Sequence, residues 1–111
     1  MPSGYEISPK EAEKQWNAEG RAVLIDVREP EEFAVARVPR AELIPMRSIP
    51  AELQRLEALA DEHDLLILCH HGVRSLQVVH WLRQQGLENC YSVAGGIDLW
   101  SCQVDPGVPR Y

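Results

Sequence analysis

Residues 65–75 read Leu-Leu-Ile-Leu-Cys-His-His-Gly-Val-Arg-Ser, and this stretch is the framework from which the rest of the chain can be interpreted. Its first four residues are apolar without alternation, which is typical of a strand buried on both faces. From Ser75 to Gln85 the apolar residues recur at helical spacing, and Gly86 then provides a typical helix end. The sequence therefore predicts a buried strand that ends at Cys69, a tight glycine-containing loop and a helix.

Short apolar runs and helical segments alternate over the rest of the chain as well. Strands are predicted at 22–27 and 90–93, with a weaker one at 41–44, and helices at 9–19, 29–33, 49–60 and 96–100. The first helix follows residues 8–11 (Ser-Pro-Lys-Glu), a capping box with proline at the first helical position. Strands that alternate with helices imply βα units, so we predict an α/β fold with a mainly parallel central sheet and helices on both faces. In such sheets, ligands bind beyond the carboxyl ends of the strands.

A chain of 111 residues has the length of one domain. We expect a single domain over residues 1–111, with a core at about 5–101 and a proline-containing tail at 102–111. No apolar run approaches the ~18 residues that a membrane span needs, and residues 1–6 lack the pattern of a signal peptide. We expect a cytoplasmic protein, present as a monomer or a weak dimer.

The net charge of −6 narrows the choice of partners, and the cysteine usage indicates the redox compartment. The acidic excess lies in residues 1–64, which carry 14 acidic and 8 basic side chains, and it argues against nucleic acid or an anionic membrane as a direct partner. The three cysteines, Cys69, Cys90 and Cys102, form no Cys-x-x-Cys pair. Without an export pattern, this predicts free thiols in a reducing compartment.

The loop from Cys69 to Ser75 is suited to a reactive thiolate. Successive backbone N–H groups in such a loop can point inward, and the N-terminus of the following helix adds a partial positive charge. Both stabilise a thiolate, which is the nucleophilic form of cysteine, and Arg74 would act in the same direction. The alternative is that Cys69 is a small buried apolar residue. We favour a nucleophile because strand, loop glycine, arginine and helix start occur in order.

Three segments, 24–33 (LIDVREPEEF), 69–75 (CHHGVRS) and 94–100 (AGGIDLW), resemble the landmarks of rhodanese-like sulfurtransferase domains in order and spacing. The tail at 105–111 is similar to that of small bacterial single-domain members. The resemblance implies a rhodanese-like fold in which Cys69 takes a sulfane sulfur from a small donor such as thiosulfate and becomes a persulfide. The sulfur then passes to a thiol, cyanide or protein acceptor, and no metal or organic cofactor is needed.

The same resemblance assigns the active-site loop and its supporting residues. The loop that surrounds Cys69 consists of His70, His71, Gly72, Val73 and Arg74, with Ser75, Asp26 and Arg28 in support. Asp26 and Arg28 occupy the family's Asp-x-Arg positions. They either frame the mouth of the site, with an Asp26–Arg74 contact as one option, or form a structural ion pair. We favour the structural role for Asp26 and leave Arg28 open.

Two other functions are compatible with the pattern. Dual-specificity phosphatases of the rhodanese-like fold have five residues between cysteine and arginine, whereas only four separate Cys69 from Arg74, so phosphatase activity is the weaker enzyme hypothesis. The chain could instead be a persulfide carrier or docking module, without turnover, for a partner in cofactor or tRNA thiolation. The acidic stretch 29–32 could then form the docking surface, although we favour a solvated face.

A metal site at Cys69-His70-His71 is disfavoured. Neighbouring loop residues cannot easily direct three ligands at one ion, and the chain has no second Cys/His pair at zinc spacing. We instead expect the two histidines to line the rim of the pocket. Of the other thiols, Cys90 is expected to pack in the core, and Cys102 stays open as a resolving thiol.

The turn at 36–41 departs from the family. Members commonly have glycine at positions 36 and 40 and histidine at 37, where this chain has Ala36, Arg37 and Arg40. Glycine permits backbone angles that alanine and arginine resist. The sequence therefore leaves the conformation of this turn open.

Overall fold

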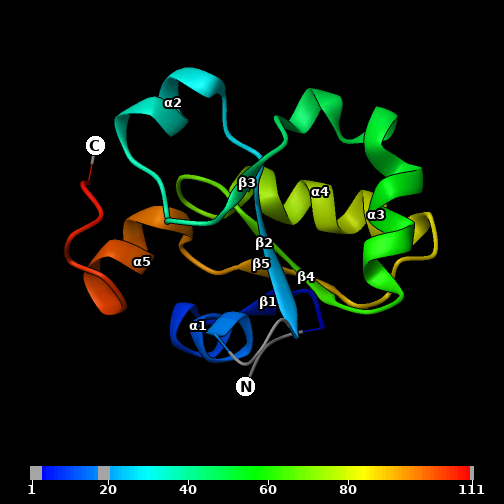
Figure 1. Cartoon of the computed structure of the whole chain (residues 1–111), viewed down its shortest axis with the longest axis horizontal. Helices are drawn as coiled ribbons and strands as arrows, with labels where there is room; N and C mark the ends of the chain where they lie inside the picture. Colours follow the sequence, from blue (N-terminus) through cyan, green and yellow to red (C-terminus); the bar gives the residue numbers. More distant parts are fainter. Residues whose placement is uncertain (1–3, 18–20, 111) are drawn as a thin grey trace.

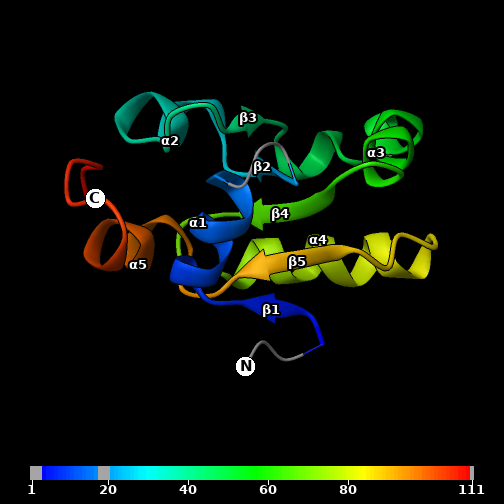
Figure 2. The ribbon, with the colours of Figure 1, turned by 60° about the horizontal axis from the view of Figure 1, so that its bottom comes forward.

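Five parallel strands form the centre of the molecule in a computed structural model that describes residues 4–17 and 21–110. The strands are β1 (Glu6–Ile7), β2 (Ala22–Asp26), β3 (Glu42–Leu43), β4 (Asp64–Leu68) and β5 (Cys90–Val93). Their order is β1-β5-β4-β2-β3, and Figure 2 shows them side by side in this sequence. All four pairings are parallel, which confirms the predicted parallel sheet.

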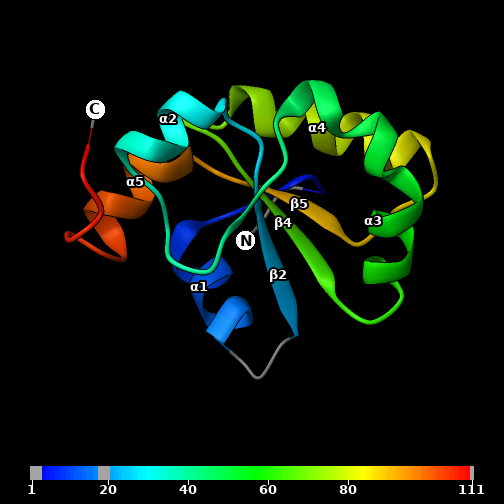
Figure 3. The same cartoon turned by 45° about the horizontal axis from the view of Figure 1, so that its top comes forward.

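Helices cover both faces of the sheet, as predicted (Figure 1). The helices are α1 (Pro9–Asn17), α2 (Pro30–Val35), α3 (Leu53–Ala60), α4 (Val73–Gln84) and α5 (Gly96–Gln103), with short 3₁₀ turns at Met46–Ser48 and Pro50–Glu52. One hydrophobic core lies between the sheet and α3 and α4, and the other lies between the sheet and α1 and α5. Figure 3 shows these two pairs on opposite sides of the central strands.

Strand β4 is buried on both faces because its side chains alternate between the two cores. Leu65 and Ile67 point into the core under α3 and α4, and Cys69 continues this row beyond the end of the strand. Leu66 and Leu68 point into the core under α1 and α5. The period of two in a strand thus places Cys69 on the α4 face of the sheet.

The predicted elements differ from the structure mainly at their ends. The helix predicted at 49–60 begins with a 3₁₀ turn at Pro50–Glu52 and becomes α-helical at Leu53. Helix α4 begins at Val73, two residues before the predicted start, and the two-residue edge strand β1 was not predicted. The predicted end of the first helix at residues 19–20 lies outside the described residues.

The C-terminal segment expected as a tail is packed against the domain. Helix α5 continues to Gln103, and the turns that follow bring Val108 into the core under α1 and α5. The Ser101 hydroxyl donates a hydrogen bond to the Val108 carbonyl, and the Arg110 guanidinium donates to Asp98 on α5. Within residues 4–17 and 21–110, none of the helices has the length and apolar character needed to cross a membrane.

Candidate active site

Cys69 follows the last residue of β4, at the carboxyl edge of the sheet where α4 begins. Its Sγ accepts hydrogen bonds from the backbone N–H groups of Gly72, at 3.0 Å, and Ser75, at 3.3 Å. The residue is 1% exposed, so these donors act with little competition from water. Two aligned N–H donors and the N-terminus of a 12-residue helix make the site favourable for a negatively charged sulfur.

Gly72 makes the tight loop possible. It is the N-terminal cap of α4 with φ +100°, in the left-handed region that residues with a side chain rarely adopt. A Cβ atom at this position would lie 3.1 Å from the backbone nitrogen of Gly95. A glycine is therefore required here both for the backbone angle and for the close approach of the segment that precedes α5.

The N-terminus of α5 fixes the same loop from the other side. The N–H of Ile97 donates to the Cys69 carbonyl at 2.8 Å, and the N–H of Asp98 donates to the His70 carbonyl at 3.2 Å. These bonds require the backbone of Gly96, with φ +62°, to lie directly against the loop. The loop is thus held between two helix N-termini. Sequence reasoning missed this contact between α5 and the loop, although the consecutive glycines Gly95 and Gly96 at the start of α5 were a signal for it.

A second polar contact to the sulfur comes from buried hydroxyl groups. The Cys69 thiol donates to Ser75 Oγ at 3.3 Å, and Ser75 Oγ is 2.7 Å from Ser92 Oγ on β5. All three side chains are buried. The predicted supporting residue Ser75 therefore contacts the sulfur through both its backbone and its hydroxyl, whereas Ser92 was not predicted as part of the site.

Arg74 connects the loop to α2. Its guanidinium donates two hydrogen bonds to the Glu32 carboxylate, at 2.7 and 2.8 Å, and both side chains are partly buried. Glu32 also accepts the N–H of Glu29 at the start of α2. The charge of Arg74 is thus balanced by a carboxylate. The hydrogen bonds that the Cys69 sulfur accepts in the structure come from the backbone N–H groups of Gly72 and Ser75.

Asp26 and Arg28 form a buried ion pair. Both side chains are fully buried, and the guanidinium meets the carboxylate at 2.7 Å. Arg28 also donates to the carbonyls of Ala36, at 2.6 Å, and Glu32, at 3.3 Å. The ion pairs described for these residues are Asp26 with Arg28 and Arg74 with Glu32. The buried pair positions the segment that carries α2.

The two histidines of the loop stack on each other. Their ring centroids are 3.9 Å apart, and the His71 side chain is exposed. His71 Nδ1 lies 4.0 Å from the Asp98 carboxylate, which also accepts the bond from Arg110. That hydrogen bond with Arg110 lowers the pKa of Asp98, and the histidines contribute in the same direction.

The remaining two thiols lie in different environments. Cys90 is buried in the core under α4, and its thiol donates to the Leu87 carbonyl at 3.2 Å. Burial raises the pKa of Cys90, although Arg83 acts in the opposite direction. Cys102 is exposed on α5. The packing role expected for Cys90 therefore agrees with its burial, while Cys102 is accessible to solvent.

The turn at 36–41 takes the backbone conformation of a glycine without having one. Arg40 has φ +69°, in the region that favours glycine. Its guanidinium lies over the Trp16 ring, 4.4 Å from the ring centroid. Ala36 is in an extended conformation that any residue can adopt. Of the two positions where the family commonly has glycine, only position 40 therefore carries backbone strain.

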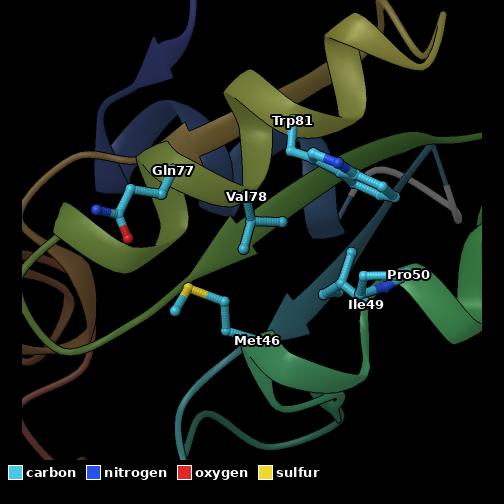
Figure 4. Close-up of a pocket in the computed structure, with 6 residues that line it drawn as sticks. All are labelled: Met46, Ile49, Pro50, Gln77, Val78 and Trp81. Carbon is cyan, nitrogen blue, oxygen red and sulfur yellow. The ribbon is translucent and has the colours of Figure 1, made fainter.

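An apolar groove runs beside α4 (Figure 4). It lies between α4 and the 3₁₀ turns that precede α3, and it is lined by Met46, Ile49, Pro50, Gln77, Val78 and Trp81. Gln77 is four residues beyond Val73, which is itself 67% exposed at the edge of the cysteine loop. The groove therefore begins about one helical turn from the loop.

Fold and loop together define a class of protein: a parallel α/β domain in which a strand-end cysteine is held by backbone N–H groups at a helix N-terminus. The model of the rhodanese-like domain family matches residues 8–103, so the chain belongs to this family. This membership agrees with the predicted fold and family.

Two relatives match over nearly their whole length. YtwF of Bacillus subtilis is 34% identical over 101 residues, which is 91% of this chain and 94% of that protein. Its full name is "Putative sulfurtransferase YtwF". The human single-domain sulfurtransferase TSTD1 has a structure that superposes with a TM-score of 0.77 at 28% identity, covering 91% of this chain and 98% of that one.

Other relatives are much longer. The rhodanese-like/PpiC domain-containing protein 12 of Arabidopsis thaliana, a chloroplastic protein, is 41% identical over 91 residues, or 81% of this chain and 30% of its own length. The chain spans between 24% and 30% of the first curated relatives that it matches. These include proteins named as adenylyltransferase and sulfurtransferase, such as uba4 of Ogataea parapolymorpha.

Proposed function

We propose that the chain transfers a sulfane sulfur through a persulfide on Cys69. The observation that carries the proposal is the pair of N–H groups, of Gly72 and Ser75, that point at Cys69 Sγ at the N-terminus of α4. Such donors favour a sulfur anion, which is the attacking form. In this proposal His70, His71, Val73 and Arg74 complete the active-site loop, and Asp26, Arg28 and Ser75 support it.

Thiosulfate is a suitable donor because the transfer then needs no oxidant or cofactor. The Cys69 thiolate attacks the outer sulfur of thiosulfate, the S–S bond of the donor breaks, and its electron pair leaves with sulfite. Cys69 is then a persulfide anion. Cyanide or a thiolate next attacks the outer persulfide sulfur, the bond to Cys69 Sγ breaks, and its electron pair restores the Cys69 thiolate. The products are thiocyanate or a persulfide of the acceptor.

Intact-mass measurement after incubation with thiosulfate tests the proposal. We expect the mass of one added sulfur atom per chain, which cyanide or dithiothreitol removes. Cys69→Ser should abolish the adduct, and the matched variant Cys102→Ser should retain it, since Cys102 is the exposed thiol. An adduct that persists in Cys69→Ser, or no adduct with either thiosulfate or polysulfide, contradicts the proposal.

A persulfide carrier or docking module without turnover of its own is a second candidate. Two observations favour it. The matching region of uba4 covers 25% of that longer protein, so a similar domain exists there as one part of a larger chain. The apolar groove beside α4, together with exposed Val73 and Met46, offers a surface for a protein acceptor near Cys69. Such a module would serve a partner in cofactor or tRNA thiolation.

The kinetics of sulfur release separate the two candidates. An enzyme with small substrates produces many equivalents of thiocyanate from thiosulfate and cyanide. A carrier retains the persulfide and releases about one equivalent per chain, and then only to a protein acceptor. Phosphatase activity is disfavoured by the four-residue spacing from Cys69 to Arg74 and by the use of the Arg74 guanidinium on Glu32.

A further inference from the structure

A pair of serine hydroxyls is buried directly beneath Cys69. Ser75 Oγ is 3.3 Å from Cys69 Sγ, Ser92 Oγ is 2.7 Å from Ser75 Oγ, and neither serine is exposed. We propose that Ser92 is a positioning residue for Cys69 and acts through Ser75. The inference rests on the proposed role of Cys69 as the nucleophile.

The register of the sheet brings these side chains together. Ser92 on β5 pairs with Ile67 on β4, and Ile67 and Cys69 point into the core under α4. Ser92 lies two residues after Cys90, which points into the same core, so its side chain is on that face. Ser75 enters this layer from the first turn of α4. The end of β4, the first turn of α4 and strand β5 therefore bring together Cys69 Sγ, Ser75 Oγ and Ser92 Oγ in one hydrogen-bonded chain.

The Ser92 hydroxyl is unusual for its place in the fold. The neighbouring core positions of β4 and α4, Ile67, Val78 and Val79, are apolar. The backbone pairing of β5 does not need a polar side chain, and a buried hydroxyl is unfavourable unless it has a hydrogen-bond partner. The hydrogen bond described for the Ser92 hydroxyl is the one to Ser75 Oγ. The hydrogen bond with Ser75 Oγ therefore explains why a hydroxyl group is present at this core position.

The direction of the two hydrogen bonds can reverse with the state of the sulfur. In the thiol state, the Cys69 S–H donates to Ser75 Oγ and the Ser75 hydroxyl donates to Ser92. In the thiolate state, the sulfur has no proton, so the Ser75 hydroxyl can donate to Sγ and accept a bond from Ser92. The second arrangement ends on an anion, and charge-assisted chains of hydrogen bonds are stronger than neutral ones. Ser92 therefore favours the thiolate that attacks the donor and that is released when an acceptor takes the sulfur.

Other charged and ionisable groups lie on the elements packed around the loop. They come from β2, α2, α4, α5 and the C-terminal segment, and they are the pairs Asp26–Arg28 and Glu32–Arg74, the two histidines His70 and His71, and Asp98 with Arg110. The hydroxyl pair must therefore be tested by variants that leave all of these groups unchanged.

A double-mutant cycle measured by thiol alkylation provides this test. The rate of iodoacetamide reaction at Cys69 is followed by peptide mass spectrometry from pH 5 to 9 in a Cys102→Ser background. Ser92→Ala is expected to lower the rate at acidic pH by about twofold to fivefold, since it removes the anion-assisted bond. In a Ser75→Ala background, Ser92→Ala should cause no further change, because the partner through which it acts is absent. Ser92→Thr retains a hydroxyl and should restore most of the rate.

Ser101→Ala is the matched control. Ser101 is also buried, but its hydroxyl bonds to the Val108 carbonyl, away from the loop. This variant should lose stability and keep the alkylation profile. The inference is overturned if Ser92→Ala leaves the profile unchanged, if its effect persists without the Ser75 hydroxyl, or if Ser101→Ala has the same effect. Alkylation needs no sulfur donor, so a failure of sulfur loading would contradict the proposed function and leave this result intact.

Discussion

Gly96, the first residue of α5, is the position where one added methyl group should do most damage to the cysteine loop. Its φ of +62° lies in the left-handed region, which costs a residue with a side chain about 1–2 kcal/mol. A Cβ atom here would lie well under 3.0 Å from the carbonyl oxygens of Cys69 and His70. These are backbone atoms that cannot rotate away as the end of a flexible side chain can.

The cost of Gly96→Ala follows from the bonds that must give way. The two carbonyls accept hydrogen bonds from the N–H groups of Ile97, at 2.8 Å, and Asp98, at 3.2 Å. Space for the methyl group is gained only by moving the loop away from α5, which weakens both bonds at about 0.5–1.5 kcal/mol each. Together with the backbone strain, the expected loss is about 2–5 kcal/mol. Because the loop that moves contains Cys69, sulfur loading should fall as well.

Urea unfolding and thiosulfate loading of Gly96→Ala and Gly86→Ala separate steric contact from backbone strain. Gly86 has φ +100°, yet a Cβ there would meet nothing within 4 Å. Gly86→Ala should therefore lose only about 1–2 kcal/mol of unfolding free energy and load sulfur normally. If Gly96→Ala is no less stable than Gly86→Ala and gains sulfur at the same rate, the reasoning about the contact between the N-terminus of α5 and the cysteine loop is refuted.

Two further predictions concern the periphery of the site. Arg40→Gly and Arg40→Ala both lose the contact with Trp16, but only the alanine variant keeps the backbone strain of φ +69°. In urea unfolding, the glycine variant should therefore be more stable than the alanine variant by about 1 kcal/mol. Equal stability of the two variants would contradict this prediction. The Arg110 hydrogen bond lowers the pKa of Asp98, so this carboxylate stabilises the fold above its unfolded-state pKa and the benefit is lost as the pH falls through the lowered value. The stability advantage over Asp98→Asn should thus be present at neutral pH and vanish in acid; an advantage independent of pH would contradict the assignment.

Local signals account for the part of the fold that was predicted correctly. The unbroken apolar run at 65–68 indicates a doubly buried strand, and the structure places these side chains alternately in two cores. The capping box at 8–11 predicts the start of α1, where the N–H of Glu11 donates to the Ser8 hydroxyl. The 3₁₀ turn at Pro50–Glu52, directly before α3, was not predicted.

The candidate site was predictable only within one segment of chain. The order Cys69, Gly72, Ser75 places a cysteine, a left-handed turn and a helix start close together, and the N–H groups then reach the sulfur without help from distant residues. The charge of Arg74 was expected to favour the thiolate. Its described partner, Glu32, is 42 positions away on α2.

By itself, the sequence determined the α/β class, the parallel sheet and the cysteine loop, because hydrophobic periodicity, capping residues and loop glycines act over a few neighbouring residues. Only the tertiary structure decided what surrounds that loop. Strand order and register bring Ser92 beneath Ser75, and the packing of α5 brings Gly96 against the Cys69 carbonyl. Such contacts depend on which elements become neighbours, and that is set by burial of the two cores as a whole, which no single stretch of sequence contains.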